Sequence, residues 1–205
     1  EILHDRRGLS VHFMLDVDGT VYQTLDLKER AWHATFANSR SVGIEMAHPG
    51  AYRARDRDRL AEWYAVDPIG STGERPQVRL RVPGTAGETG VRTPDFVARP
   101  IRAGLVTGEI QGQALVQYDF TAEQYVALAR LLAALCRVFP RLACDFPRNA
   151  EGAVEPECLT EARWAEFHGV LGHYHIQTNK VDPGPAFQWE RVVEEARQQL
   201  KRGRR

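Results

Sequence analysis

The chain has 205 residues, of which 43% are hydrophobic and 26% are charged. This length suits one domain with a packed core, and the composition excludes a disordered chain. Lysine plus arginine and aspartate plus glutamate number 27 each, so no overall basic field points to nucleic acid. No stretch approaches the roughly 20 apolar residues that span a bilayer, so we expect no transmembrane segment. The basic stretch 201–205 is expected to be a solvated chain end.

The three cysteines, Cys136, Cys144 and Cys158, give little information about function. Their spacing matches neither a zinc finger nor a disulfide framework. Cys136 falls on the apolar face of a predicted helix, where a buried, unreactive thiol is the usual case. The cysteines therefore leave the cellular compartment open.

Alternating apolar residues predict a β-hairpin over residues 9–25. Its turn is predicted at Asp18-Gly19, a dipeptide that is typical of type I′ turns. A further strand is predicted over 41–47, with Val42, Ile44 and Met46 on one face. Glu45 lies on the opposite face between the small residues Gly43 and Ala47, which would leave open space around its carboxylate. This pattern indicates a working surface.

The middle of the chain changes in character. Residues 52–64 predict a charged, amphipathic helical stretch. From residue 65 to residue 117, thirteen of 53 residues are glycine or proline, and a short β-like piece covers 78–82. Because 65–117 is too long for an ordinary connection, we interpret it as an insertion of loops and short strands. It is either a substrate-covering flap or a decoration.

The last third of the chain predicts helices. Thr121 to Gln124 form a capping box, and apolar residues at 3,4,3,4 spacing follow as far as the stop at Pro140. Shorter helical patterns cover about 160–170 and 189–200. Strands followed by helices, without a tandem repeat, predict an α/β or α+β sheet covered by helices.

The segment 171–189 carries the side chains best suited to chemistry. It places His173, Lys180 and Asp182 within ten residues, just before a Pro-Gly-Pro sequence, and so resembles a shaped loop more than a core element. A catalytic zinc needs three protein ligands, and His173 and Asp182 offer two. Zinc lowers the pKa of bound water to about 7. A carboxylate such as Glu45 can take the proton, and Lys180 can neutralise a developing oxyanion.

Four segments occur together in the order that is typical of one family: 10–23, 30–34, 41–45 and 172–187. With them the chain resembles the zinc-dependent N-acetylmuramoyl-L-alanine amidases, which share their fold with phage amidase lysozymes and peptidoglycan recognition proteins. The resemblance covers residues 9–47 and 121–200, whereas 65–117 has no counterpart. It implies an α/β fold with a central mixed β-sheet flanked by helices, and hydrolysis of the amide between N-acetylmuramic acid and L-alanine in peptidoglycan or muropeptides.

The resemblance also implies roles for individual residues. His173 and Asp182 correspond to two zinc ligands, and Lys180 corresponds to the family's catalytic lysine. Val11 stands where one branch of the family has a catalytic tyrosine, and the branch without that tyrosine uses a glutamate at the position of Glu45. We therefore expect Glu45 and Lys180 to be catalytic, and Zn²⁺ to be the cofactor.

Four further histidines, His33 and Trp32 are weaker candidates for the site. Trp32 and His33 either line the substrate groove or pack within the fold. His12 is expected to hydrogen-bond within the fold, and His175 to support the site or lie exposed. His48 and His168 are expected to be structural or on the surface.

The family's first zinc ligand is a histidine about twenty residues before the segment that contains His12. We expect this third ligand upstream of Glu1, since His4 lies only eight residues before His12 and is a poor substitute. We accordingly expect residues 1–205 to form a single amidase-like domain without its N-terminal strand. Any export signal is also expected upstream of Glu1. The resemblance suggests the bacterial cell envelope, periplasmic or secreted.

Two alternatives to this function stay open. The first is a non-catalytic peptidoglycan-binding module that has lost its metal site. The second is a hydrolase with the same mechanism on another amide, which the unplaced segment 65–117 would make possible. The sequence does not decide between intact wall and soluble muropeptide as the substrate, and it leaves the oligomeric state unknown.

Overall fold

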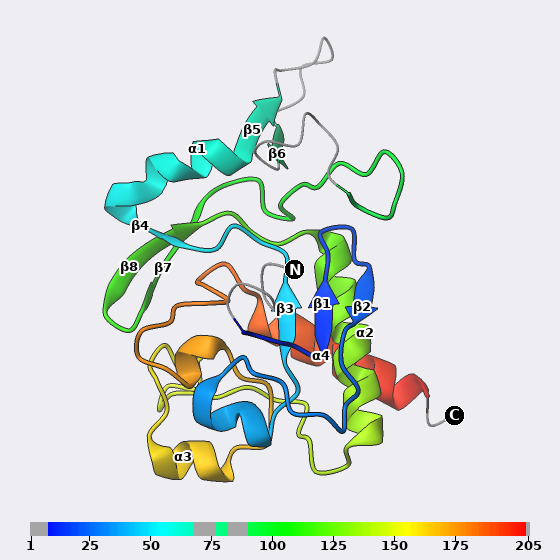
Figure 1. Cartoon of the computed structure of the whole chain (residues 1–205). Helices are drawn as coiled ribbons and strands as arrows, with labels where there is room; N and C mark the ends of the chain where they lie inside the picture. Colours follow the sequence, from blue (N-terminus) through cyan, green and yellow to red (C-terminus); the bar gives the residue numbers. More distant parts are fainter. Residues whose placement is uncertain (1–7, 68–76, 82–89, 204–205) are drawn as a thin grey trace.

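The computed structural model describes residues 8–67, 77–81 and 90–203, and it has a mixed α/β architecture (Figure 1). Three small sheets and four α-helices are found in these residues. The mixed α/β class predicted from the sequence is therefore confirmed. The sheet is smaller than the single central sheet that was expected, because the strands are divided among three sheets.

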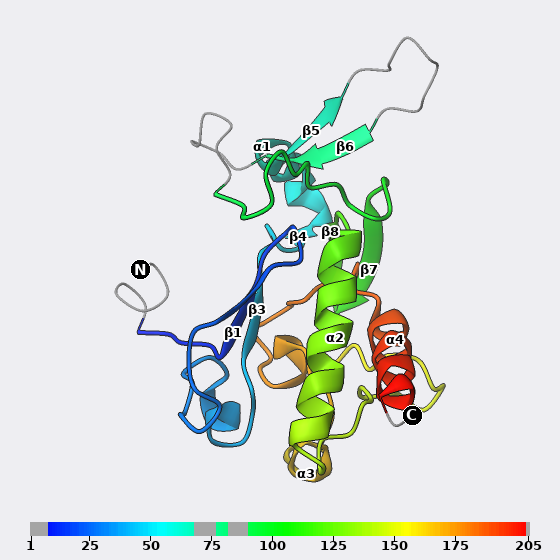
Figure 2. The same ribbon diagram turned by 90° about the vertical axis from the view of Figure 1, so that its right-hand side faces the viewer.

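The first sheet contains β1 (Phe13–Leu15), β2 (Val21–Gln23) and β3 (Ile44–Met46) in the order β2-β1-β3. β1 pairs with β2 antiparallel and with β3 parallel. Figure 2 shows the long helix α2 (Ala122–Val138) lying between this sheet and the C-terminal helix α4 (Trp189–Arg202). The sheet therefore has one face covered by helices.

The two faces of this sheet differ as the alternating pattern predicts. Phe13 and Leu15 are buried, whereas Met14 between them is exposed. Met14 stands opposite Tyr22 on β2 and Glu45 on β3, and both of these residues are also exposed. The row Tyr22–Met14–Glu45 thus crosses the face of the sheet that is turned away from α2.

The predicted hairpin is confirmed, but its predicted turn type is wrong. β1 and β2 are joined by five residues, because Leu15 pairs with Val21. Gly19 N–H donates to the carbonyl of Asp16 (3.0 Å), and Gly19 has φ +82°. A type I′ turn at Asp18-Gly19 would also need a positive φ at Asp18, which does not have one. Instead the Asp18 carboxylate accepts a hydrogen bond from Thr20 N–H (2.8 Å), so a longer turn is stabilised.

Pairing of the first sheet ends soon after β3, at Pro49, which has no N–H to donate. The chain then forms a separate antiparallel sheet from β4 (Tyr52–Arg53), β8 (Gln113–Gln117) and β7 (Val106–Ile110), in that order. This change of partner is one reason why no single central sheet forms.

A two-stranded sheet of β5 (Tyr64–Asp67) and β6 (Gln77–Leu80) follows a short helical stretch. That stretch consists of a 3₁₀-helix over Ala54–Arg59 and helix α1 (Leu60–Trp63). The helical interpretation of 52–64 is therefore confirmed for 54–63, and its ends belong to strands. The β-like piece at 78–82 is confirmed in β6, and its last residue lies outside the described part.

Helix α2 begins at a complete capping box formed by Thr121 and Gln124, as predicted. The third helix, α3 (Glu161–Glu166), is shorter than the predicted 160–170. Residues 168–170 instead form backbone hydrogen bonds with the segment 143–145, Ala143 N–H to His168 O (2.7 Å) and Val170 N–H to Asp145 O (2.8 Å). Among the described residues, no helix is long and apolar enough to cross a membrane.

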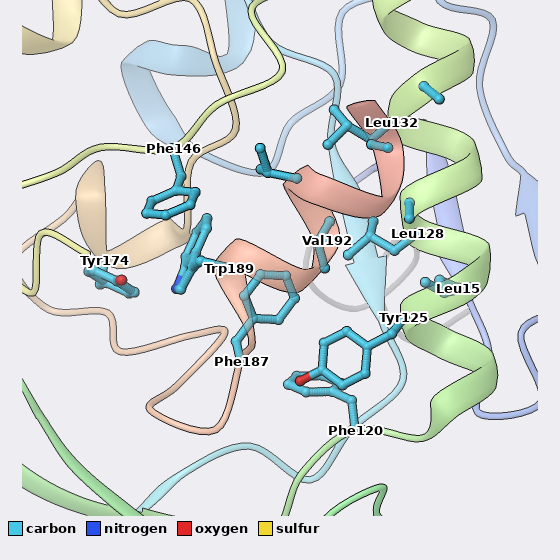
Figure 3. Packing of buried hydrophobic residues seen from close by; sticks show 14 of the residues in the cluster. Leu15, Phe120, Tyr125, Leu128, Leu132, Phe146, Tyr174, Phe187, Trp189 and Val192 are labelled. Carbon is cyan, nitrogen blue, oxygen red and sulfur yellow. The ribbon is translucent and has the colours of Figure 1, made fainter. Parts of the chain in front are cut away.

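The main core lies between α2, α4 and the first sheet (Figure 3). Leu128 and Leu132 of α2 face Val192 of α4, as the helical spacing predicts. An aromatic group continues this core toward the segment 171–189, and Trp189 packs against Phe187 at 4.8 Å between ring centroids. The end of that segment is thus part of the core. The aromatic residues labelled in Figure 3 are Phe120, Tyr125, Phe146, Tyr174, Phe187 and Trp189.

Two buried histidines connect distant backbone segments near the sheet. The ring of His12 accepts the N–H of Gly43 at Nδ1 (3.0 Å) and donates from Nε2 to the carbonyl of Glu29 (3.1 Å). His175 repeats this arrangement with Gly172 N–H (2.9 Å) and the carbonyl of Glu155 (2.9 Å). Because Nδ1 of each ring accepts a backbone N–H, the proton that each ring donates is on Nε2. The structural role expected for His12 is confirmed, and the same role applies to His175.

Candidate functional site

Segment 171–189 is anchored beside the first sheet by a small apolar cluster. Ile176, Ala34 and Ala37 form its buried centre, and Trp164 and Leu171 pack around them. The 3₁₀-helix η2 (Thr35–Ser39) and the 3₁₀-turn η4 (His173–His175) are thereby brought together. In Figure 1, η4 (orange) lies on the β3 side of the first sheet. Three parts of the sequence thus meet at this place.

His173 and Asp182 point toward each other, although nine residues separate them. The distance between His173 Nδ1 and Asp182 Oδ2 is 3.0 Å. On the other side of the ring, His173 Nε2 lies 2.7 Å from Gln177 Oε1. The Asp182 side chain is 58% exposed, whereas that of His173 is 20% exposed. The loop therefore brings the two predicted ligands within hydrogen-bond distance of each other.

The charges of this pair stabilise each other. Burial alone would lower the pKa of His173, but the hydrogen bond and negative charge of Asp182 outweigh it and raise that pKa overall. Burial would raise the pKa of Asp182, but the hydrogen bond and charge of His173 lower it overall. Lys180 lowers the pKa of both groups through its positive charge. The ammonium group of Lys180 is therefore close enough to act on this pair.

The separation of His173 and Asp182 suits two ligands of one zinc ion. With zinc–ligand bonds of about 2.1 Å at a tetrahedral angle, neighbouring ligand atoms lie about 3.4 Å apart, and the observed distance is 3.0 Å. One imidazole nitrogen and one carboxylate oxygen are also ligand types that zinc prefers. In the described part of the chain, no group of three histidine, cysteine or acidic side chains could hold a metal. His4 lies outside the described residues.

Glu45 lies on the exposed face of β3, between the half-buried residues Ile44 and Met46. The alternation predicted for this strand is therefore confirmed, since Ile44 and Met46 pack against the main core. β3 is an edge strand of its sheet, on the side where η4 lies in Figure 1. The fold thus presents Glu45 on the open sheet face of an edge strand.

Trp32 and His33 enter the same region from the segment before η2. The Trp32 side chain is exposed (53%), and the guanidinium of Arg30 lies over its ring at 4.4 Å. The buried Asn38 accepts hydrogen bonds from the backbone N–H groups of His33 (3.0 Å) and Ala34 (2.6 Å), which fixes the turn that carries these residues. Trp32 is therefore available to a ligand.

The His33 ring packs against Gly43, the residue two before Glu45. A Cβ on Gly43 would lie 2.9 Å from the ring atoms of His33, so only glycine leaves room for the ring. Burial, and after it the neighbouring His12 and His173, lowers the pKa of His33 to about 4. His33 is therefore a neutral imidazole within electrostatic range of the His173–Asp182 pair.

The far side of the segment is held by the β7–β8 hairpin, at the end of the segment 65–117 that is predicted to be an insertion. Gln117 of β8 is fully buried, donates to the carbonyl of Pro183 (2.9 Å) and accepts the N–H of Ala186 (3.0 Å). On β7, Gly108 lies directly against Pro185, where a Cβ would be 2.6 Å from the proline side chain. These contacts could not be predicted from the sequence, because nothing local to Gln117 indicates its partner.

The comparisons with known proteins bear on the first third of the chain. Residues 2–76 match the family model described as N-acetylmuramoyl-L-alanine amidase. Searches of the curated proteins and of the solved structures gave no match. The matched range contains Trp32, His33 and Glu45 but ends before segment 171–189, so the roles of His173, Lys180 and Asp182 stay predictions. The match confirms the predicted resemblance for residues 9–47 and extends into the start of the 65–117 segment, which was expected to have no counterpart: over residues 2–76, this chain carries the sequence pattern of the N-acetylmuramoyl-L-alanine amidase family.

Proposed function

We propose that this protein hydrolyses the amide between N-acetylmuramic acid and L-alanine in peptidoglycan or muropeptides, with zinc as its cofactor. The observation that supports the proposal best is the 3.0 Å approach of His173 Nδ1 and Asp182 Oδ2, with the charge of Lys180 beside them. The family match over residues 2–76 supports the same reaction independently. We further propose a fold like that of peptidoglycan recognition proteins, and a location in the bacterial cell envelope.

His173 and Asp182 would hold the zinc, together with a third ligand from outside the described residues. When bound, zinc polarises the scissile carbonyl and lowers the pKa of water. Glu45 would accept the proton of the attacking water, since it is exposed on the open face of the first sheet. Lys180 would donate hydrogen bonds to the carbonyl oxygen as negative charge develops there. Trp32 and His33 would line the groove for the muropeptide.

The competing function is a non-catalytic module that binds peptidoglycan. One observation favours it, namely that the described residues bring together only two of the three side chains that a zinc site needs. The two functions predict the same ligand and differ in its fate. A muropeptide should be cleaved in the first case and recovered intact in the second.

Replacing Lys180 by alanine tests the catalytic proposal. We expect the rate of muropeptide cleavage to fall by about 10²- to 10³-fold, because one donor to the oxyanion is lost. Folding should survive, since the contacts of Lys180 with Gln177 and Gln111 involve its backbone N–H and carbonyl and not its ammonium group. The rate is measured by chromatography of a defined muropeptide, and the melting temperature serves as the measure of folding.

Lys28→Ala is the matched control, because Lys28 lies in the exposed connection after β2. It should cleave like the unchanged protein. Undiminished cleavage by Lys180→Ala would contradict the assigned role of Lys180. Intact muropeptide after incubation with the unchanged protein, together with measurable binding, would favour the non-catalytic module.

A further inference from the structure

The tip of the β7–β8 hairpin contacts the loop that carries His173, Lys180 and Asp182. Ile110 pairs with Gln113, so Gln111 and Gly112 form a two-residue turn. Both have positive φ, +51° and +66°, as a type I′ turn requires. The N–H of Gln111 donates to the carbonyl of Pro156 (3.1 Å), which fixes the tip against a third segment. The turn therefore presents the Gln111 side chain in a defined direction.

The side-chain amide of Gln111 bridges two carbonyls of the loop. Its Nε2 donates to the carbonyl of Gln177 (2.9 Å) and to the carbonyl of Lys180 (2.6 Å). A primary amide has two N–H donors, so these contacts use both of them. Gln177 and Lys180 are also joined directly, since Lys180 N–H donates to the carbonyl of Gln177 (3.2 Å). Gln111 thus fastens both ends of the turn 177–180.

This turn connects directly to the candidate zinc ligands. The Gln177 side chain meets His173 Nε2 at 2.7 Å, and the opposite nitrogen of that ring meets Asp182 at 3.0 Å. Lys180 lies two residues before Asp182. A shift of the turn 177–180 would therefore move Lys180. It would also displace the Gln177 side chain, which orients the His173 ring.

We propose that Gln111 is a positioning residue for the candidate amidase site, acting through the turn 177–180 on Lys180 and His173. The proposal rests on the proposed function in one respect, the effect on catalysis. It also assigns a role to the end of the 65–117 segment, which thereby becomes part of the site's support. Positioning errors of about 1 Å can cost as much as 10²-fold in rate, so an effect on turnover should be measurable.

The test compares Gln111→Ala and Gln111→Glu with Gln113→Ala in the full-length protein. Glutamate keeps the shape of the side chain but has no N–H, so its carboxylate would face two carbonyl oxygens. Gln113 lies two residues away on the same hairpin, and its side chain accepts a hydrogen bond from Arg53 (3.2 Å) instead of contacting the loop. It therefore controls for any general loosening of the hairpin.

Two readouts are needed, hydrogen exchange of the amides in 173–182 and the kinetics of muropeptide cleavage. Both Gln111 variants should exchange these amides faster, and kcat should fall about 10- to 100-fold with little change in KM. Gln113→Ala should leave both unchanged. Unchanged exchange in 173–182, or faster exchange with an unaltered kcat, would overturn the proposal. Faster exchange in a protein that never cleaves muropeptides would instead contradict the proposed function, and the anchoring of the loop by Gln111 would stand.

Discussion

Replacing Glu45 by glutamine is expected to lower the rate of muropeptide cleavage by about 10²- to 10⁴-fold, because the variant keeps the size of the side chain but cannot accept the proton of the attacking water. Glu45 is exposed on the edge strand β3, and the neighbouring residues Ile44 and Met46 hold the strand in the core. Substitution at such an exposed position usually changes the free energy of unfolding by no more than about 0.5 kcal/mol. Activity should therefore be lost without loss of the fold.

Glu109→Gln is a suitable control for this substitution. Glu109 is also an exposed glutamate within a strand, but it belongs to β7 in the second sheet. The control should cleave at the rate of the unchanged protein. If Glu45→Gln retained full turnover while Lys180→Ala lost it, the proton acceptor would have to be another group.

Replacing Gly184 by alanine is expected to reduce the free energy of unfolding by about 2–4 kcal/mol, from backbone strain and steric overlap together. Gly184 has φ +92°, a left-handed conformation that alanine adopts only at a cost. A Cβ at this position would also overlap the side-chain oxygen of Gln117. Gln117 is fully buried and hydrogen-bonded to Pro183 and Ala186, so it cannot move aside without losing those bonds.

Gly50→Ala separates the contribution of backbone strain from that of steric overlap. Gly50 has φ +90°, nearly the same as Gly184, but a Cβ there would have no atom within 4 Å. It should therefore show only the strain contribution, about 1 kcal/mol. Urea denaturation of both variants gives the comparison. Equal losses would contradict the view that Gly184 is required by its contact with Gln117.

The features of the fold that were predicted correctly depend on local sequence. Helix α2 could be placed because Thr121 and Gln124 have the three-residue spacing of a capping box, and the buried faces of β1 and β3 follow from alternation. The division into three sheets depends on pairing between β4 and β8, which are 60 residues apart in the chain. Helix α3 ends early because residues 168–170 bond to 143–145. Neither the β4–β8 pairing nor the early end of α3 is indicated by the residues next to it in the sequence.

In the candidate site, too, some residues could be predicted from local sequence and others could not. His173 and Asp182 could be chosen as partners because the resemblance relates both to one family motif, and the structure brings them together. Gln111 and Gln117 were not predicted, although the short alternating stretch around Gln111-Gly112 is compatible with a hairpin turn. Glutamine has no chemistry that marks a site, and its role here comes from carbonyl groups more than 60 residues away. Only the three-dimensional contacts assign it.

The zinc content of the full-length protein tests the central claim most directly. Elemental analysis of protein purified without chelators should find about one zinc per chain, and Asp182→Asn should lose it, because one of the three ligands is weakened. Asp56→Asn, a change in the 3₁₀-helix before α1, should retain the metal. A folded protein that binds muropeptides but contains no zinc would contradict the account and identify a binding module instead.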